Sequence, residues 1–465
     1  MKKLFYYSSL YTASAVVVKS ISFLVILFLG KYFSPKTYAV FGLLYSMHQG
    51  VSSFAIAGIN ESVIGFLKDL KTKAEKNNLY SKVLFATLPS TILIFFLALI
   101  FYLIYFKKQN PDLLFIYFVF TIFSGLLLSF SIFNSKILRL KENHFGSLLY
   151  LFFPPILIFL CGSISVYISN NINYFFVSSF FSVLIFLALI KLFYSDGNLP
   201  LKYGNITKKI IINSLPYYTI AILGWLGGYG INFIINFFFG SLEIAAYTFI
   251  YTISGALLMI SNALNQVWAP RFYNSYSEVS FVELERKNNH FYGILAVLLG
   301  IAVSLIIQFY PIVLGLIGGN LVYYSEMKLE LYLILASYII YTPIWHYRIH
   351  FYANSKGSQL MKITALSSIA GLLSMVFCIK FFDSIGIYYG FFSMTLINLL
   401  AISIVVKTKW KLMINWFGVL LGCSISLITF LITESGVNLI YSVLFTIFSV
   451  CSLLIYINTT KLKLR

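Results

Sequence analysis

The fold is decided by residues 241–273, which read SLEIAAYTFIYTISGALLMISNALNQVWAPRFY. The stretch begins as an apolar helix of about 20 residues, long enough to cross a bilayer core at roughly 1.5 Å per residue. It ends in polar residues, of which Asn262, Asn265 and Gln266 occupy positions i, i+3 and i+4 and so share one helix face. Because buried amides need partners or water, we expect this face to line a cavity.

An earlier stretch has the same plan and indicates an internal duplication. Residues 30–67 begin with a glycine turn, continue as an apolar helix and end in the polar Asn60 and Glu61. The two stretches are offset by about 210 residues, and polar bends at 135–147 and 348–360 repeat nearly this spacing. We therefore predict parallel repeats, related by an axis along the membrane normal, with a central cavity between them.

The composition indicates a polytopic membrane protein. The 465 residues are 60% hydrophobic and 10% charged, which is too apolar for a soluble enzyme. Apolar runs predict fourteen transmembrane helices at 10–30, 38–66, 83–106, 113–135, 146–168, 172–193, 211–239, 243–269, 291–310, 329–352, 362–381, 386–406, 412–432 and 437–458. The expected fold is all-α, with six-helix bundles at residues 1–200 and 201–410 and two additional helices at 411–465.

The basic residues predict the orientation of the chain. Of 33 lysines and arginines, 26 fall on one side of the predicted helices, 6 fall on the other, and Lys19 alone lies within a span. Since basic residues accumulate on the cytoplasmic side, both termini are expected in the cytoplasm. The dispersion of these residues over short loops argues against nucleic acid as a partner.

Motifs for catalysis or for metal binding are absent from the sequence. Its four cysteines lie in apolar runs without paired spacing. There is no phosphate loop, no H-E-x-x-H and no nucleophile elbow. The predicted outer loops are also too short for a catalytic domain. We therefore expect no ATP hydrolysis, no catalytic residue, no metal and no cofactor, and a transporter in place of an enzyme.

Three ionisable residues within predicted spans are candidate site residues, each with a structural alternative. Lys19 either faces the cavity as a cation, or snorkels to the cytoplasmic surface or pairs with Glu61. Glu61 is either an interfacial charge or a group that titrates during transport. His48 either hydrogen-bonds a backbone carbonyl or serves as a cavity donor or proton carrier. Glu61 and His48 are thus the candidates for coupling or gating.

Two arginines end predicted helices on the cytoplasmic side. Arg271 ends the eighth helix, and Arg348, flanked by His346 and His350, ends the tenth. Each arginine is either a topology anchor or a ligand contact. Together with Lys19 and the histidines, they would surround the cytoplasmic mouth of the cavity and offer the donors that pyrophosphate requires.

The chain resembles the Wzx-type O-antigen and capsule flippases, the polysaccharide transporter branch of the multidrug/oligosaccharidyl-lipid/polysaccharide exporter (MOP) superfamily. The resemblance rests on the helix arrangement along the whole chain and on the run N-Q-x-W-x-P at residues 265–270. Similar proteins place cations on the first, second and eighth helices around the cavity. Lys19 and Arg271 fit that pattern, whereas the second helix here offers His48.

This resemblance implies a flippase of the bacterial inner membrane. The implied substrate is an undecaprenyl-pyrophosphate-linked oligosaccharide, an O-antigen or capsule repeat unit used in lipopolysaccharide or capsule synthesis. The implied partners are membrane lipids, a polysaccharide polymerase and a chain-length regulator. The absence of ATP motifs leaves an ion gradient, the membrane potential or consumption of the substrate outside as the driving force. The alternatives are a multidrug or cation antiporter of the same fold and a membrane polysaccharide polymerase.

Overall fold

The structure is a computed structural model in which the described residues are helices, turns and short connections, without strands. It describes residues 2–56, 58–59, 73–109, 113–140, 143–193, 204–275, 280–353, 356–410, 412, 416–435, 440 and 443–451. The chain divides into two compact units. Unit 1 is Met1–Leu29 with Phe33–Thr248, and unit 2 is Gly30–Tyr32 with Phe249–Arg465. The bundles predicted at 1–200 and 201–410, and the pair predicted at 411–465, rest on sequence repeats and stay predictions.

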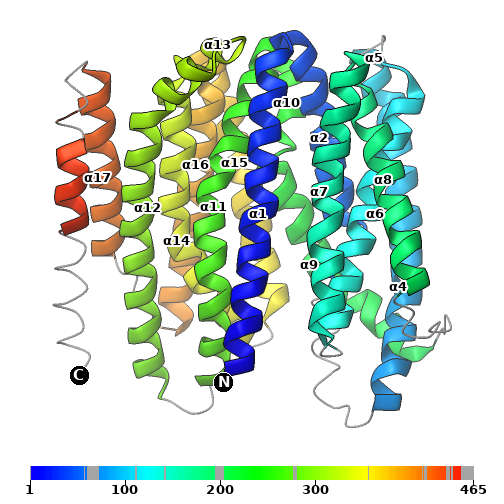
Figure 1. Cartoon of the computed structure of the whole chain (residues 1–465). Coiled ribbons are helices and arrows are strands. Elements are labelled where there is room, and N and C mark those ends of the chain that lie inside the picture. Colours follow the sequence, from blue (N-terminus) through cyan, green and yellow to red (C-terminus); the bar gives the residue numbers. More distant parts are fainter. Residues whose placement is uncertain are drawn as a thin grey trace. The chain divides into compact units, whose positions relative to one another are not determined.

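Unit 1 contains most of α1 and the helices up to the start of α11 (Figure 1). These are α1 (Lys2–Tyr32), α2 (Pro35–Phe54), α4 (Lys73–Phe101), α5 (Lys107–Gln109), α6 (Phe115–Leu140), α7 (His144–Ser169), α8 (Tyr174–Phe193), α9 (Asn205–Leu226), α10 (Ile231–Phe238) and the first turns of α11 (Ser241–Ser275). A π-helical segment, Tyr102–Phe106, joins α4 to α5.

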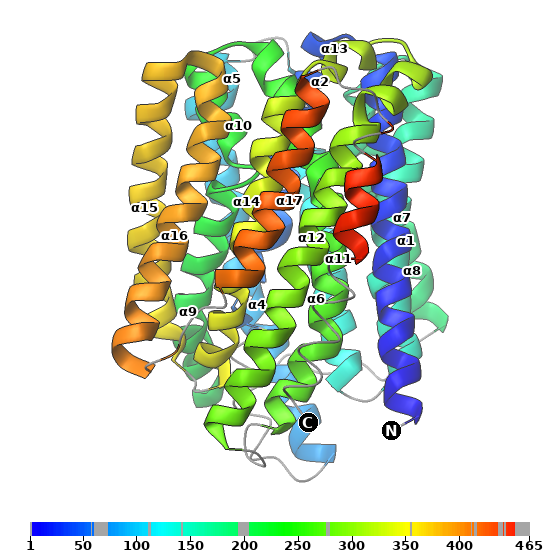
Figure 2. The same cartoon turned by 90° about the vertical axis from the view of Figure 1, so that its left-hand side faces the viewer.

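Unit 2 contains the rest of α11 and the helices that follow it. These are α12 (Phe281–Ile317), α13 (Leu321–Ser325), α14 (Lys328–Ala353), α15 (Gly357–Phe382), α16 (Gly386–Trp410) and α17 (Trp416–Glu434). A 3-10 turn, Asp383–Ile385, separates α15 from α16. Within this unit α15 packs along α16, and α17 packs along α12 (Figure 2).

The helices have the length and surface of membrane spans. Among the described residues, eight helical segments are long and apolar enough to cross a membrane, or nine if α9 and α10 form one bent span. On α15, Ile369, Leu373, Phe377 and Phe381 recur every four residues, and each is more than half exposed. A contiguous apolar stripe of this kind suits contact with lipid. The chain is therefore an all-α polytopic membrane protein, while the number fourteen stays a prediction.

Several predicted helices are confirmed with small changes at their ends. The helix predicted at 146–168 lies within α7, and the one predicted at 329–352 lies within α14. The polar bends predicted at 135–147 and 348–360 contain the α6 to α7 and α14 to α15 connections. The last predicted span, 437–458, falls only partly within the described residues.

The helix predicted at 38–66 is interrupted after Phe54, so the prediction of one continuous helix is wrong. In the structure α2 ends at Phe54, and a turn follows. Gly58 has φ +75°, a left-handed conformation that a helix does not contain and that glycine adopts without strain. A Cβ at Gly58 would also overlap the carbonyl oxygen of Ser214 on α9. The chain must therefore leave the helix here in order to pass close to α9.

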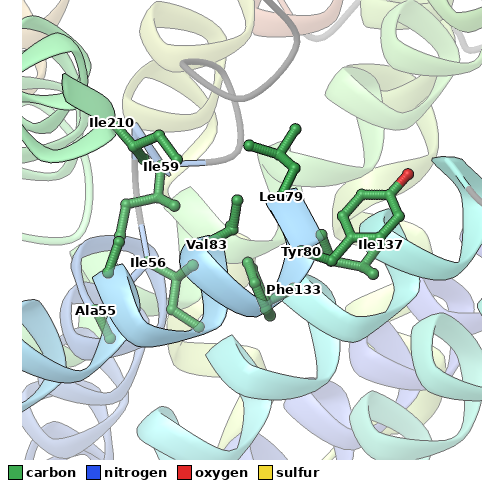
Figure 3. Packing of buried hydrophobic residues seen from close by; sticks show 10 residues of the cluster. Ala55, Ile56, Ile59, Leu79, Tyr80, Val83, Phe133, Ile137 and Ile210 are labelled. Atoms are coloured by element: carbon green, nitrogen blue, oxygen red, sulfur yellow. The ribbon is translucent and has the colours of Figure 1, made fainter. Parts of the chain in front are cut away.

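A buried apolar cluster explains why α9 belongs to unit 1 (Figure 3). Its members come from the turn after α2 and from α4, α6 and α9: Ala55, Ile56, Ile59, Leu79, Tyr80, Val83, Ala86, Phe133, Ile137 and Ile210. Each is at most 8% exposed. Burial of a large apolar side chain contributes about 1.5–3 kcal/mol, so this cluster holds the ends of four segments together.

Candidate functional site

A broken helix lies in unit 1 between α9 and α10. The sequence predicts one helix over 211–239, but the two helices meet at an angle of 44°, with a break at residues 227–230. This prediction is wrong because three of those four residues are glycines, which stabilise a helix poorly. The hydroxyl of Tyr247 donates to the carbonyl of Gly228 at 3.0 Å. The same carbonyl also accepts from the Ile231 backbone N–H at 3.1 Å, so it is satisfied inside the unit, as a membrane interior requires.

Asn232 is the centre of a buried polar network beside this break. Its Nδ2 donates to Ser46 Oγ on α2 at 2.8 Å and to Thr248 Oγ1 on α11 at 2.9 Å. All three residues are 0% exposed. The Nε1 of Trp225 donates to the Ser46 carbonyl at 2.8 Å. The network therefore ties α2, α9, α10 and α11 together within unit 1.

Replacement of Asn232 by alanine is expected to destabilise the protein by about 1–3 kcal/mol, because two buried hydroxyls lose their donor. The measurement is unfolding of the purified chain by titration with SDS, followed by circular dichroism. Asn134→Ala is the matched control, since the Asn134 amide donates to the Phe130 carbonyl of its own helix and to no other helix among the described residues. Equal midpoints for the two variants would mean that the network contributes no net stability.

His48 lies in the packed interior of unit 1. Its Nε2 is 3.3 Å from Ser124 Oγ on α6, and the residue is 1% exposed. The rings of Tyr45 and Phe176 lie against the imidazole, with centroids 6.4 and 5.3 Å away. The hydrogen-bond partner is thus a side-chain hydroxyl, and not the backbone carbonyl considered from sequence. A role for His48 as a cavity donor or proton carrier stays a prediction.

Lys19 is exposed on α1. No described acidic group lies within ion-pair distance of its ammonium. Glu61, the predicted alternative partner and coupling candidate, falls outside the described residues. Pairing of Lys19 with Glu61 therefore stays a prediction, as does the cavity-facing role.

The polar end of α11 makes two contacts with α12 in unit 2. The hydroxyl of Tyr292 donates to Asn265 Oδ1 at 2.9 Å. The Nε1 of Trp268 donates to Asn288 Oδ1 at 2.7 Å, and its ring stacks on Phe291 at 4.5 Å between centroids. Asn265 and Trp268 of the N-Q-x-W-x-P run thus join two helices, a role that the sequence did not predict. The side chains of Asn262, Gln266 and Arg271 fall outside the described part of the chain.

A carboxylate and two imidazoles meet between α12 and α14. His346 Nε2 is 2.8 Å from Glu285 Oε1, and His350 Nε2 is 2.7 Å from Glu285 Oε2. The three side chains are 11% exposed for Glu285, 2% for His346 and 0% for His350. The Tyr292 ring lies edge-on to His346 at 5.1 Å. The cluster is therefore connected, through Tyr292, to Asn265 on α11.

Arg348 does not join its neighbouring histidines in this cluster. Its guanidinium carbon lies 5.3 Å from the centre of the Tyr341 ring, a cation–π contact. Two residues along a helix correspond to a rotation of roughly 200°, so Arg348 lies on a different face of α14 from His346 and His350. Arg348 therefore does not share the contacts of the two histidines in unit 2, and its predicted place at the cytoplasmic mouth of the cavity stays a prediction.

Sequence reasoning missed Glu285 entirely. A usable signal was present in the spacing of His346 and His350, which at i and i+4 lie on one helix face. Two histidines on one face need a partner when they are buried. The identity of that partner was not available from the sequence, because Glu285 is 61 and 65 residues away along the chain.

Solved structures with a similar fold are membrane transporters. The lipid II flippase MurJ, in an inward closed conformation, has a TM-score of 0.62 and 12% identity, over 98% of this chain and 99% of that chain. An outward-facing multidrug resistance MATE family transporter of the MOP superfamily has a TM-score of 0.57 and 15% identity, over 87% and 95%. For a mutant of the Vibrio cholerae MATE transporter VcmN the values are 0.55 and 15%, over 88% and 97%.

No protein-family profile matches the chain, and no curated protein sequence matches it. At identities of 12–15% the structural similarity establishes the fold alone. The chain thus has the polytopic helical fold of MOP superfamily transporters.

Proposed function

We propose that the chain is a flippase for lipid-linked oligosaccharides. It moves an undecaprenyl-pyrophosphate-linked O-antigen or capsule repeat unit from the cytoplasmic to the outer face of the bacterial inner membrane. The observation that carries the proposal is the similarity in fold to a lipid II flippase over 98% of this chain. Transport proceeds by alternating access, in which one substrate site opens first to the cytoplasm and then to the outside.

The physical barrier to unaided crossing is large. Each sugar hydroxyl that loses water without gaining a hydrogen bond costs several kcal/mol, and an ionised pyrophosphate costs far more. The polyprenyl chain is apolar and can remain in the lipid. A flippase therefore needs polar and cationic groups for the headgroup and no enclosed site for the tail.

The charge of the chain supports an anionic substrate. The sequence has 33 lysines and arginines against 14 aspartates and glutamates, and Lys19 lies within a predicted span. Lysine and arginine are the side chains that bind phosphate groups. We propose Lys19, Arg271 and Arg348 as pyrophosphate contacts, and His48, Asn262, Asn265 and Gln266 as further polar contacts.

A multidrug antiporter is the second candidate, because the MATE transporters share the fold. Their similarity, however, covers 87–92% of this chain against 98% for the lipid II flippase. The difference is about 30 to 50 residues, which is less than the 55 residues of the C-terminal pair predicted at 411–465. An exporter of cationic drugs is also expected to have acidic groups in its cavity, and this chain has few acidic residues.

Deletion of the gene is expected to trap lipid-linked oligosaccharide on the cytoplasmic face of the inner membrane. The measurement compares the fraction of glycolipid in spheroplasts that a membrane-impermeant sugar oxidant modifies, before and after deletion. Expression of the unmodified chain should restore outward exposure. Accumulation of single repeat units on the outer face would instead identify a polymerase, and a change in drug sensitivity without a change in glycolipid would identify a multidrug exporter.

A further inference from the structure

The cluster of Glu285, His346 and His350 has the donor set of a transition-metal site. Its one carboxylate oxygen and two imidazole nitrogens come from two helices, and the three donor atoms lie within 4.8 Å of one another. Two histidines at i and i+4 on one helix with a carboxylate from elsewhere are a common zinc ligand set. We propose that these three residues bind a divalent transition-metal ion, with Zn²⁺ as the best fit, and that the ion fastens α12 to α14.

The three donor side chains lie close together, with each imidazole nitrogen beside a different oxygen of Glu285. In a tetrahedral site with metal–ligand bonds of about 2.0–2.1 Å, neighbouring donor atoms are roughly 3.4 Å apart. The histidine nitrogens lie 2.8 and 2.7 Å from the two Glu285 oxygens, and these separations would widen by well under an ångström. All three donor atoms lie within 4.8 Å of one another, so the widest separation would shorten by an ångström or so. Aromatic rings hold the imidazoles in place, with Tyr292 against His346 at 5.1 Å and Phe272 against His350 at 5.0 Å.

The buried charge favours a bound cation. Without an ion, the Glu285 carboxylate accepts hydrogen bonds from two imidazoles in a site that is nearly closed to water. The Nδ1 of His346 has no hydrogen-bond partner among the described residues, which fits a neutral imidazole with its proton on Nε2. A divalent ion would compensate the charge of the carboxylate and would bind the Nε2 lone pairs of two neutral imidazoles.

The surroundings offer a fourth position and a route of entry. His346 also lines a small cleft with Asn289, Tyr292 and Pro343, whose volume of about 10 Å³ is close to that of a single water ligand. α12 has 37 residues, about 55 Å of helix, which is longer than the roughly 30 Å hydrocarbon core. Its first turns carry the exposed Arg286 and Lys287 beside Glu285. An ion can therefore enter this end of unit 2 without crossing hydrocarbon.

The ligand chemistry selects the class of ion. Na⁺, Mg²⁺ and Ca²⁺ prefer oxygen ligands, whereas imidazole nitrogen suits Zn²⁺ and its neighbours in the first transition series. This inference departs from the expectation, made from sequence motifs, that the chain binds no metal. It does not depend on the identity of the transported substrate.

The test uses the purified full chain in detergent, stripped of metal and titrated with Co²⁺, whose visible absorption reports tetrahedral nitrogen and oxygen ligation. We expect one Co²⁺ per chain, displaced by Zn²⁺, and a higher unfolding temperature with Zn²⁺ but not with Mg²⁺ or Ca²⁺. Glu285→Gln and His350→Ala should each weaken Co²⁺ binding more than about tenfold. His290→Ala is the matched control, because His290 lies on α12 outside the cluster, and it should bind normally.

The unmodified chain decides the outcome even if a variant does not fold. Absence of stoichiometric Co²⁺ binding to the unmodified chain would overturn the proposal. Binding that persists in both Glu285→Gln and His350→Ala would also overturn it, because the ion would then be held elsewhere. Equal stabilisation by Mg²⁺ and Zn²⁺ would contradict the assignment to imidazole ligands.

Discussion

Replacement of Gly422 by leucine is expected to separate α17 from α12 and to destabilise unit 2 by about 3 kcal/mol or more. The two helices touch through their backbones. A Cβ at Gly422 would overlap the carbonyl oxygen of Ala296, and a Cβ at Gly300 would overlap that of Gly422. One turn earlier on α17, a Cβ at Gly418 would lie 2.6 Å from the Cα of Gly293. A backbone atom cannot rotate away as a side chain can, so the helices must move apart.

The spacing of Gly418 and Gly422 is the small-xxx-small pattern that brings membrane helices together. Close approach also allows the hydrogen bond from Thr429 to Ser304 at 3.0 Å farther along the same contact. Separation of the helices would lose this bond together with the apolar contacts of Ile425 with Val297 and Ile301. The loss of folding free energy in Gly422→Leu is therefore expected to exceed that caused by overpacking at one position alone.

The measurement is the SDS concentration at the midpoint of unfolding, together with the yield of folded chain in the membrane. Gly315→Leu is the matched control on α12, because the position of a Cβ there has no neighbouring atom within 4 Å. Gly422→Ala should lie between the unmodified chain and Gly422→Leu. If Gly422→Leu were as stable as Gly315→Leu, α17 would not pack on α12 as described.

Features that depend on local sequence were predicted well. Apolar runs identified membrane helices because a helix that crosses the bilayer needs about 20 apolar residues in a row. Such a run can be recognised in the sequence without knowledge of the contacts between helices. The spans predicted at 146–168 and 329–352 lie within α7 and α14 for this reason. Two predicted helices are interrupted, and both interruptions contain glycines. At residues 227–230 and at Gly58 the helix is interrupted. The apolar composition of these segments does not predict the interruption.

Features that depend on contacts between helices were not predicted. The amides at the end of α11 were expected to line a cavity, since a buried amide needs a partner. Asn265 meets that need with a tyrosine hydroxyl on α12, which satisfies the same physical requirement inside one unit. In the same way, the histidines of α14 were expected at the mouth of the cavity with Arg348, and the sequence did not show that their hydrogen-bond partner is Glu285. The residue type shows that a buried amide or imidazole needs a hydrogen-bond partner. Only the three-dimensional packing determines which residue that partner is.

Replacement of Lys19 by alanine is expected to reduce flipping of lipid-linked oligosaccharide more than about tenfold without loss of folded protein. A cation in the middle of a membrane helix costs about 2.5–3.5 kcal/mol on insertion scales, so its removal should favour insertion. The two possible roles of Lys19, substrate contact and structural support, therefore predict opposite changes in the stability of this variant. If Lys19 contacts the pyrophosphate, transport falls while stability stays equal or rises, whereas a lysine that only holds the fold would lose both.

Lys19→Arg keeps the charge and should retain most of the transport, because guanidinium also binds phosphate oxygens. The matched control is Ser20→Ala, an exposed neighbour on α1 that carries no charge. Pairing with Glu61 makes a different pattern: Glu61→Gln would cause the same defect, and the double variant would recover because neither charge is left unpaired. If the Lys19→Ala variant flipped the substrate as fast as the Ser20→Ala variant, Lys19 would not contact the substrate. The anionic headgroup would then have to bind other lysines or arginines of the chain.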